Sequence, residues 1–306
     1  MSSSTPASPY TQRYIRYAKL LGFFNLIPSI RLRVKFAKLV APSLSPDVLL
    51  DEKILNNLAG CEASLAPHEM GAIVEQFHRH ACIGGLDHIS RARKSTAWLR
   101  KNVVFDGIEA LEESLATRDG GVLVLTYHNH YKFLLPVTLG LRGHSVSALA
   151  IDYKLSEVYQ NAEGAKIYQN FFSEIESYWN GGQFIYINGQ DPIKTYKKVL
   201  KSFGRNKVLV SLNDVYSPLS GTRNISTRFL GKEVICPTGT IETALQKTAD
   251  IYSAHIQWSD EIQGYKVIIE KLDTSSGVEN VAKQYMDNFA NVVTQDPAIW
   301  EGWKLL

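Results

Sequence analysis

From residue 100 onward, short apolar runs alternate with helical windows, and this alternation constrains the fold more than any other feature. Six runs have the length and residue types of strands: 122–127, 145–151, 184–188, 207–213, 252–258 and 266–272. Apolar residues three and four apart predict helices at 131–143, 156–179, 191–205, 237–251 and 278–295. Strands separated by such helices form βαβ units. We therefore expect an α/β fold with a mixed, mostly parallel sheet covered by helices on both faces.

The last two predicted strands differ from the others because only the short loop DEIQG, residues 260–264, separates them. A connection this short joins antiparallel strands, so 252–258 and 266–272 are expected to form an antiparallel edge. Upstream, residues 1–12 are rich in Ser, Thr and Pro and predict a disordered arm, and 13–100 predict a helical N-terminal portion. We find no internal repeat and no linker, so 13–306 is interpreted as a single domain.

The composition excludes several classes of protein. Of the 306 residues, 45% are hydrophobic and 21% are charged, and the net charge is +3, as in an ordinary globular protein rather than a nucleic-acid-binding one. Cys61, Cys82 and Cys236 are an odd number without paired spacing, which argues against a disulfide scaffold or a metal site. We find neither the order of a signal peptide nor a charge-free apolar window of 18 residues, so a cytoplasmic location is expected.

One basic stretch stands out near the start, because no acid occurs from 9 to 46 while Arg and Lys alternate with Leu, Ile, Phe and Val. One interpretation is a helical pair that packs its apolar stripe on the core and exposes a solvated basic face. Another is an interfacial segment over residues 13–41 that meets an anionic membrane on its inner face, or an acidic carrier protein. The two interpretations are compatible.

His128 directly follows the predicted strand 122–127 in the segment GGVLVLTYHNHYKFLLP. The carboxyl ends of strands in α/β sheets are where ligands bind, and the helix predicted from about 131 would offer free amides there. A histidine at this position is suited to chemistry. The alternative is a strand-end histidine that only caps the next helix.

Four blocks of the chain resemble, in order, the lysophospholipid acyltransferase superfamily, in particular its bacterial lipid A late (lauroyl/myristoyl) acyltransferase branch. The first is GGVLVLTYHNHYKFLLPVTLGLRGHSVSALA, which is similar to the family's G-x-(apolar)4-T-x-H block. NKVLVSLNDVYSP with Asp214, TRFLGKEVICPTGTIETALQKTADI and DPAIWEGWKLL resemble the three later blocks. The resemblance spans about residues 100–306.

The resemblance implies a glycerolipid acyltransferase-like fold and transfer of acyl groups other than aminoacyl groups. The donor would be a thioester of an acyl carrier protein or coenzyme A, used as co-substrate without a tightly bound cofactor, metal or nucleic acid. The acceptor would be a hydroxyl or an amine. In the family the histidine of the first block is the general base, and this position corresponds to His128. A neutral imidazole suits that role, because a hydroxyl must lose its proton as it attacks.

The family's histidine is followed by four residues and then an acid that orients it, but here Phe133 occupies that position. Three interpretations are open. Another carboxylate replaces the missing one, with Asp214 or Glu242 as candidates and Asp152 behind them. Alternatively, an amine acceptor needs less help, so that an unoriented His128 suffices with His130 as a helper. In the third, the chain is a catalytically degenerate lipid- or carrier-binding protein on the same fold.

The candidate site residues extend beyond the two histidines and the two carboxylates. Arg223, Arg228 and Lys232 are candidates for binding a donor phosphate, or else form a solvated basic loop. Asn188 and Asn213 end two predicted strands, and Asn129 and Lys132 flank the histidines. Further candidates for substrate contact are therefore Asn129, Lys132, Asn188 and Asn213.

Several other residues are given structural roles. His255 lies in the middle of a predicted strand, so we expect a satisfied core histidine, and Trp300 and Trp303 are expected to pack the C-terminal segment. A third possible function is hydrolysis, and a hydrolase would need a nucleophilic side chain. Ser211 and Cys236 are present, but neither lies in a G-x-S-x-G elbow.

Overall fold

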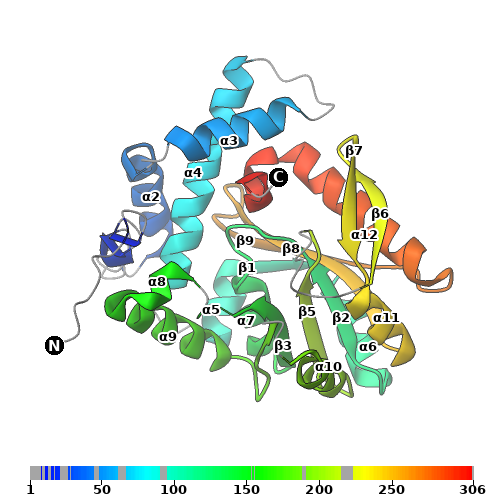
Figure 1. The fold of residues 1–306 in the computed structure, drawn as a ribbon. Helices are drawn as coiled ribbons and strands as arrows, with labels where there is room; N and C mark the ends of the chain where they lie inside the picture. The colour runs from blue at the N-terminus through cyan, green and yellow to red at the C-terminus, as the bar shows by residue number, and fades with distance from the viewer. Residues whose placement is uncertain are drawn as a thin grey trace.

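A mostly parallel seven-stranded sheet forms the centre of the protein (Figure 1). The computed structural model describes residues 29–44, 48–60, 67–89, 95–152, 156–187, 191–214 and 223–304, together with residues 8, 11, 12, 15, 16, 18–20, 27 and 154. The sheet has the order β1-β9-β8-β2-β5-β3-β4. Its strands are β1 (Val103–Asp106), β2 (Val122–Thr126), β3 (Ser145–Ile151), β4 (Phe184–Ile187), β5 (Lys207–Leu212), β8 (Asp250–Ser259) and β9 (Gly264–Lys271).

Helices cover both faces of this sheet, which confirms the predicted α/β fold. The helices before the last strand pair are α2 (Ile30–Leu44), α3 (Val48–Ala59), α4 (Pro67–Ile89), α5 (Thr96–Asn102), α6 (Ile108–Thr117), α7 (Leu134–Leu141), α8 (Glu157–Gln160), α9 (Ala162–Glu176), α10 (Pro192–Lys201) and α11 (Gly239–Gln246). After β9 come α12 (Gly277–Gln295) and two short 3₁₀ turns, η3 (Pro297–Ile299) and η4 (Glu301–Lys304). Each predicted strand and helix from 122 onward is present, with ends that differ by a few residues.

Alternation along the buried strands divides the core between two faces. Val122 and Val124 of β2 face a cluster that includes α5, α6, α7 and α9, whereas Leu123 and Leu125 face a second cluster with α3, α10, α11 and α12. The four side chains are completely buried because β2 is covered on both sides. This explains why the strand is a continuous apolar run rather than an alternating one.

The antiparallel pair was predicted correctly, but its place as an edge was wrong. β8 and β9 pair antiparallel, and β1 then adds to β9 in the parallel sense and becomes the edge strand. β1 has only the four residues VVFD and directly follows α5, so its sequence gives little strand signal. The edge strand β1 therefore comes from the boundary between the predicted helical portion and the predicted α/β portion.

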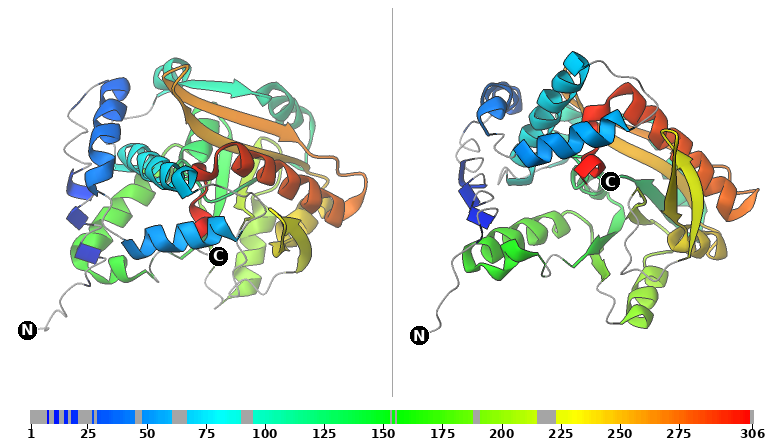
Figure 2. Two further views of the ribbon diagram at one scale, coloured as in Figure 1. Left: turned by 90° about the horizontal axis from the view of Figure 1, so that it is seen from above. Right: turned by 45° about the horizontal axis from the view of Figure 1, so that its top comes forward.

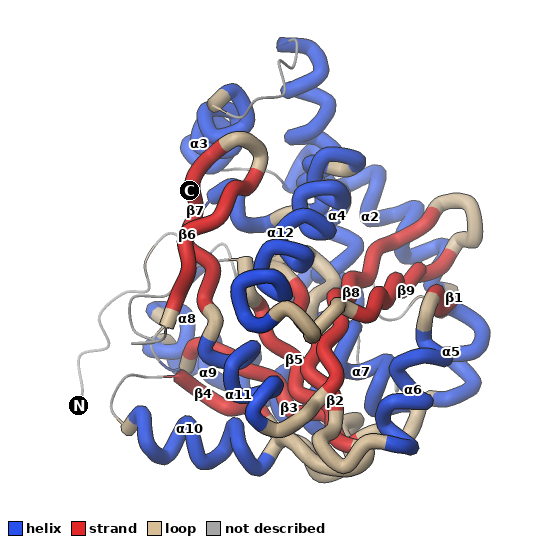
Figure 3. The backbone as a smooth tube through the Cα atoms, turned by 90° about the vertical axis from the view of Figure 1, so that its right-hand side faces the viewer, coloured by secondary structure: helices blue, strands red, loops and turns tan. Residues whose placement is uncertain are grey.

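A second sheet, the hairpin of β6 (Asn224–Phe229) and β7 (Lys232–Pro237), replaces the basic loop considered above. Leu230 and Gly231 form its turn and both have positive φ, 48° and 80°, as a two-residue hairpin turn of type I′ requires. The hairpin stands apart from the main sheet (Figure 3). It packs on α12, where the rings of Phe229 and Phe289 stack with centroids 4.5 Å apart.

The N-terminal portion is helical where the structure describes it, but little of the predicted arm is included. Of residues 1–12 only Ser8, Thr11 and Gln12 are described, and the last two are helical, so the disordered arm stays a prediction. Asn57 of α3 donates a 2.6 Å hydrogen bond to the carbonyl of Trp303, which places α3 beside the C-terminal turns (Figure 2). None of the helices in the described ranges combines the length and the apolar character needed to cross a membrane.

Helix α4 packs closely on the loop that follows β2, and a glycine makes this possible. A Cβ atom built on Gly84 would lie 2.1 Å from the carbonyl oxygen of His130. Main-chain atoms cannot move aside as a flexible side chain can. The loop from His128 to Phe133 is thus held against α4 by a close backbone contact.

This contact predicts opposite effects for two glycines of the same helix. Gly84→Ala should lower the free energy of unfolding by about 1–3 kcal/mol, because the added methyl group overlaps the His130 carbonyl. Gly71→Ala is the matched control, since a Cβ there meets nothing within 4 Å. It should stabilise the protein by about 0.5–1 kcal/mol through helix propensity. Chemical denaturation of the two variants measures both values, and equal effects would contradict the close packing.

Candidate active site

His128 and Asp214 meet at the carboxyl ends of two adjacent parallel strands. β2 and β5 are paired so that Thr126 lies opposite Leu212, and the two site residues each come two positions later. The chain therefore brings them to the same level at the same edge of the sheet. This is the edge at which open α/β sheets bind ligands.

The contact between the two side chains is short and well aligned. Nδ1 of His128 lies 2.7 Å from Oδ1 of Asp214, and the backbone N–H of His128 donates to Oδ2 over 2.8 Å. The Asp214 side chain is completely buried, whereas 31% of the His128 side chain is exposed. The carboxylate thus holds the buried side of the imidazole, while part of the ring is exposed to solvent.

A third donor to Asp214 comes from Trp300. Its Nε1–H donates to Oδ2 over 2.7 Å, and the indole is 1% exposed. The adjoining backbone is fixed as well, since Trp300 forms a β-bridge with Asn129 and the N–H of Glu301 donates to the His128 carbonyl over 2.8 Å. The expectation that Trp300 packs the C-terminal segment is correct. Its hydrogen bond to Asp214 was not foreseen.

These donors favour the ionised form of Asp214. Burial raises the pKa of its carboxyl, but the attraction of His128 and the hydrogen bonds from His128 and Trp300 outweigh burial, so the net pKa is lowered. The carboxylate is therefore ionised at neutral pH and accepts the Nδ1 proton of His128. In the neutral imidazole with its proton on Nδ1, the lone pair lies on Nε2.

Phe133, at the position of the missing acid, is part of an aromatic cluster. Its ring contacts Phe171 and Phe172 edge to face, with centroids 5.1 and 5.8 Å apart. It also directly precedes α7, which begins at Leu134 rather than near 131. The expected helix N-terminus beside His128 is therefore absent. Residues 130–133 form turns before the helix starts, and the backbone there packs closely on α4 at Gly84.

The other acid–base candidates lie elsewhere. Glu242, in the first turn of α11, pairs with Arg223 over 2.9 Å and accepts from Thr238 Oγ1 over 3.1 Å. His130 is 4% exposed, and its Nδ1 lies 3.3 Å from Glu301 Oε1. Asp152 accepts from the N–H of Lys154 over 3.0 Å. Of the three acids considered, Asp214, Glu242 and Asp152, the one that contacts His128 is Asp214.

The residues proposed for substrate contact have different surroundings. Asn129 is completely buried and accepts from the N–H of Tyr131, and Lys132 forms an ion pair with Glu301. Asn213 is 2% exposed; it accepts from Ser211 and donates to the Pro237 carbonyl. These three side chains stabilise the loops that carry His128 and Asp214. Asn188 lies outside the described residues.

The basic candidates lie on or near the β6–β7 hairpin. Arg223 is 82% exposed at its side chain and is engaged with Glu242. Arg228 is exposed on β6. Lys232 of β7 is partly buried, and its Nζ would lie 3.0 Å from a Cβ atom built on Gly60. Of the three, Arg228 is the one whose side chain is exposed without a described ion pair.

Neither nucleophile considered for a hydrolase is suited to that role. Burial, followed by the negative charge of Asp214, raises the pKa of the Cys236 thiol to about 12, so no thiolate forms at neutral pH. Ser211 is 4% exposed and donates to Asn213 Oδ1 over 2.6 Å. A covalent enzyme intermediate is not supported at either residue.

The fold and the site together define an α/β protein with a histidine–carboxylate pair at the carboxyl edge of its sheet. The chain belongs to the family described as bacterial lipid A biosynthesis acyltransferase, whose model matches residues 30–303. Membership confirms the resemblance seen in the sequence and indicates an acyltransferase activity. A search of curated proteins finds no match for the chain.

The lowered pKa of Asp214 predicts how stability depends on pH. A carboxyl whose folded-state pKa lies below its ordinary value of 3.8 stabilises the protein above that value, and this contribution is lost as the pH falls through the folded-state pKa. Asp214→Asn should therefore lower the free energy of unfolding at pH 7 by about 2 kcal/mol. The difference from wild type should shrink below pH 4.

Glu242→Gln is the control, because it removes one negative charge from an ion pair whose Arg223 partner is largely exposed. We expect a change below about 1 kcal/mol. Urea unfolding of the three proteins between pH 3 and pH 7 measures these differences. A gap between wild type and Asp214→Asn that stays constant over that range would show that the charge of Asp214 is not what stabilises the site.

Proposed function

We propose that the protein transfers an acyl group from a thioester to a hydroxyl or amine, with His128 as general base. The donor is an acyl carrier protein or coenzyme A thioester. The single observation that carries the proposal is the 2.7 Å contact between His128 Nδ1 and buried Asp214, which replaces the acid missing at Phe133. Family membership supports the acyl-transfer chemistry.

The geometry supports a direct transfer. Nε2 of His128 takes the proton of the acceptor hydroxyl as that oxygen attacks the thioester carbonyl. The new C–O bond forms, the C–S bond then breaks, and the departing thiolate takes the proton back from the imidazolium. The products are an acyl ester and a free thiol, and His128 returns to its neutral state. No nucleophilic side chain is required, in agreement with the buried, protonated Cys236.

Asp214 acts in this proposal as a positioning residue. It keeps the Nδ1–H tautomer, so that Nε2 faces the substrate as a base, and its negative charge stabilises the imidazolium that forms during transfer. Trp300 and the backbone N–H of His128 hold the carboxylate in place. An amine acceptor remains compatible with the same step, but the site no longer has to rely on an unoriented imidazole.

Three variants test the proposal. His128→Ala should lower kcat/KM by about 10²–10⁴-fold, and Asp214→Asn by up to about 10⁴-fold, because the amide favours the wrong tautomer. Glu242→Gln should stay within about threefold of wild type, since Glu242 is engaged with Arg223 and Thr238 and the carboxylate at His128 is Asp214. Release of free thiol is measured with lauroyl-carrier protein and lauroyl-coenzyme A, each with a lipid A precursor, a lysophospholipid and a long-chain amine.

The competing function is a lipid- or carrier-binding protein without catalysis on the same fold. Thiol release by wild type that is lost in His128→Ala would exclude it. Binding of the acyl thioester without thiol release for every donor and acceptor would support it, and would contradict catalysis at His128.

We also propose that α2 contacts an anionic membrane surface. Leu32, Phe36 and Leu39 are 48%, 43% and 74% exposed and lie on one helix face, with exposed Arg31 and Lys35 beside them. An apolar stripe bordered by basic side chains is typical of interfacial helices. The partner is therefore expected to be a bilayer with anionic headgroups.

Sedimentation with vesicles tests this contact. Wild type should bind phosphatidylglycerol vesicles at least tenfold more tightly than phosphatidylcholine vesicles, and the triple change L32S/F36S/L39S should abolish the preference. Ile193→Ser is the matched control, because Ile193 is 68% exposed on α10 and not on this face. Equal loss in both variants, or binding by the triple variant, would contradict a role of α2.

A further inference from the structure

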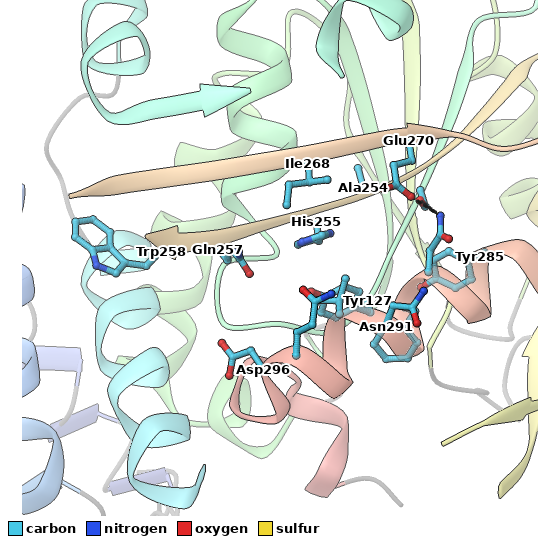
Figure 4. A pocket seen from close by; sticks show the side chains of 15 residues that line it. Tyr127, Ala254, His255, Gln257, Trp258, Ile268, Glu270, Tyr285, Asn291 and Asp296 are labelled. Carbon is cyan, nitrogen blue, oxygen red and sulfur yellow. Dashed lines mark hydrogen bonds between the residues drawn. The ribbon is translucent and has the colours of Figure 1, made fainter. Parts of the chain in front are cut away.

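A pocket of about 460 Å³ lies between α12 and the strands β8 and β9, outside the His128–Asp214 pair (Figure 4). β8 runs parallel to β2 but continues past its end, since Leu125 lies opposite Ser253 and β8 extends to Ser259. The polar side chains of this extension, including His255 and Gln257, face α12 across the pocket. The volume matches that of small-molecule sites.

Tyr127 forms part of the wall, and its hydroxyl is the strongest indication of a ligand. The side chain is 2% exposed, its ring stacks on Phe289 at 4.6 Å, and its Oη has no hydrogen-bond partner among the described residues. Buried hydroxyl groups are nearly always hydrogen-bonded. Burial, with the charges of Asp296 and Asp214, raises the pKa of Tyr127 well above its usual value, so Oη keeps its proton as a donor.

Tyr127 and His128 are neighbours in sequence, but of the two only Tyr127 lines the pocket. Tyr127 packs with the core cluster on the α12 side, whereas His128 contacts Asp214 beyond β5. A ligand in the pocket would therefore touch the residue next to His128 and not the imidazole itself. The pocket is a separate site beside the pair.

The lining indicates an uncharged, hydroxyl-rich ligand. Burial, followed by the charge of Lys266, lowers the pKa of His255 to about 4, so the imidazole is neutral near pH 7. Gln257, Asn291 and Gln295 add amides that can both donate and accept. Glu270 and Asp296 on the wall disfavour anions. His255 is thus not the satisfied core histidine expected from the sequence, because its strand extends beyond β2 to border a cavity.

We propose that this pocket binds a neutral polyol of monosaccharide size, with the hydroxyl of Tyr127 donating to a ligand oxygen. The amides and the neutral imidazole serve the other hydroxyl groups, and the apolar side chains of Ile268 and Val292 contact the C–H face of the ring. This site goes beyond the proposed acyl transfer, because its occupation requires neither His128 nor Asp214.

Saturation-transfer NMR titrations test the proposal with D-glucose, N-acetyl-D-glucosamine, glucose 6-phosphate and octanoate as probes. At least one neutral sugar should bind saturably, and more tightly than its phosphate or octanoate. Tyr127→Phe should weaken this binding about tenfold, as expected for the loss of one buried hydrogen bond, and Asn291→Ala should weaken it as well. His128→Ala should bind like wild type, so that failure of acyl transfer and failure of this site are distinguishable.

A thermal measurement separates ligand binding from structural damage. Tyr127→Phe should leave the melting temperature of the ligand-free protein unchanged or higher, since its hydroxyl has no described partner. Tyr252→Phe is the matched buried control, because its hydroxyl bonds to Ser114 and the Ala110 carbonyl, and it should lower the melting temperature. No saturable binding by either neutral sugar, equal binding by Tyr127→Phe, or preference for the anionic or apolar probe would each overturn the proposal.

Discussion

The buried carboxylate of Asp214 is the interaction on which the site depends. A carboxylate taken out of water is tolerated only when donors replace its hydration, and here three do so: the ring and the N–H of His128 and the indole of Trp300. Each donor comes from a segment that must be fixed by packing elsewhere. The loop after β2 is held by α4 through Gly84, and the segment around Trp300 by its bridge to Asn129. The same packing contacts therefore stabilise the core and orient the imidazole.

Substitution of the family's acid by Phe133 changes where the orienting charge comes from, and not whether it is present. In the usual pattern the acid lies one turn after the histidine, so a single loop determines both. Here the partner lies 86 residues away, two residues after the end of β5, and the side chain of Phe133 packs with the rings of Phe171 and Phe172. The orientation of the base is then determined by the alignment of two central strands. Such an alignment is rigid because a shift by one residue would reverse every buried side chain of β5.

The sequence predicted the strands and helices from 122 onward because their periodicities are strong, and it placed His128 and Asp214 at strand ends. It did not choose between Asp214 and Glu242, because that choice depends on the pairing of β2 with β5, which local sequence does not encode. β1 was missed because four residues carry almost no pattern, and the β6–β7 hairpin because its strands are half exposed and polar. The role of Trp300 and the pocket at His255 arise from contacts between distant segments, for which a single sequence offers no signal.

The hydrogen bond from the His128 backbone N–H to Asp214 also has a consequence for how the protein folds. Neither partner can form it until β2 and β5 have paired, and the chain that connects these two strands includes β3 and β4. Contacts of such sequence separation form slowly, and amides that depend on them exchange with solvent only when the central sheet opens. The imidazole therefore has no native partner in a partly folded chain. The acid–base pair appears in the same cooperative step as the sheet.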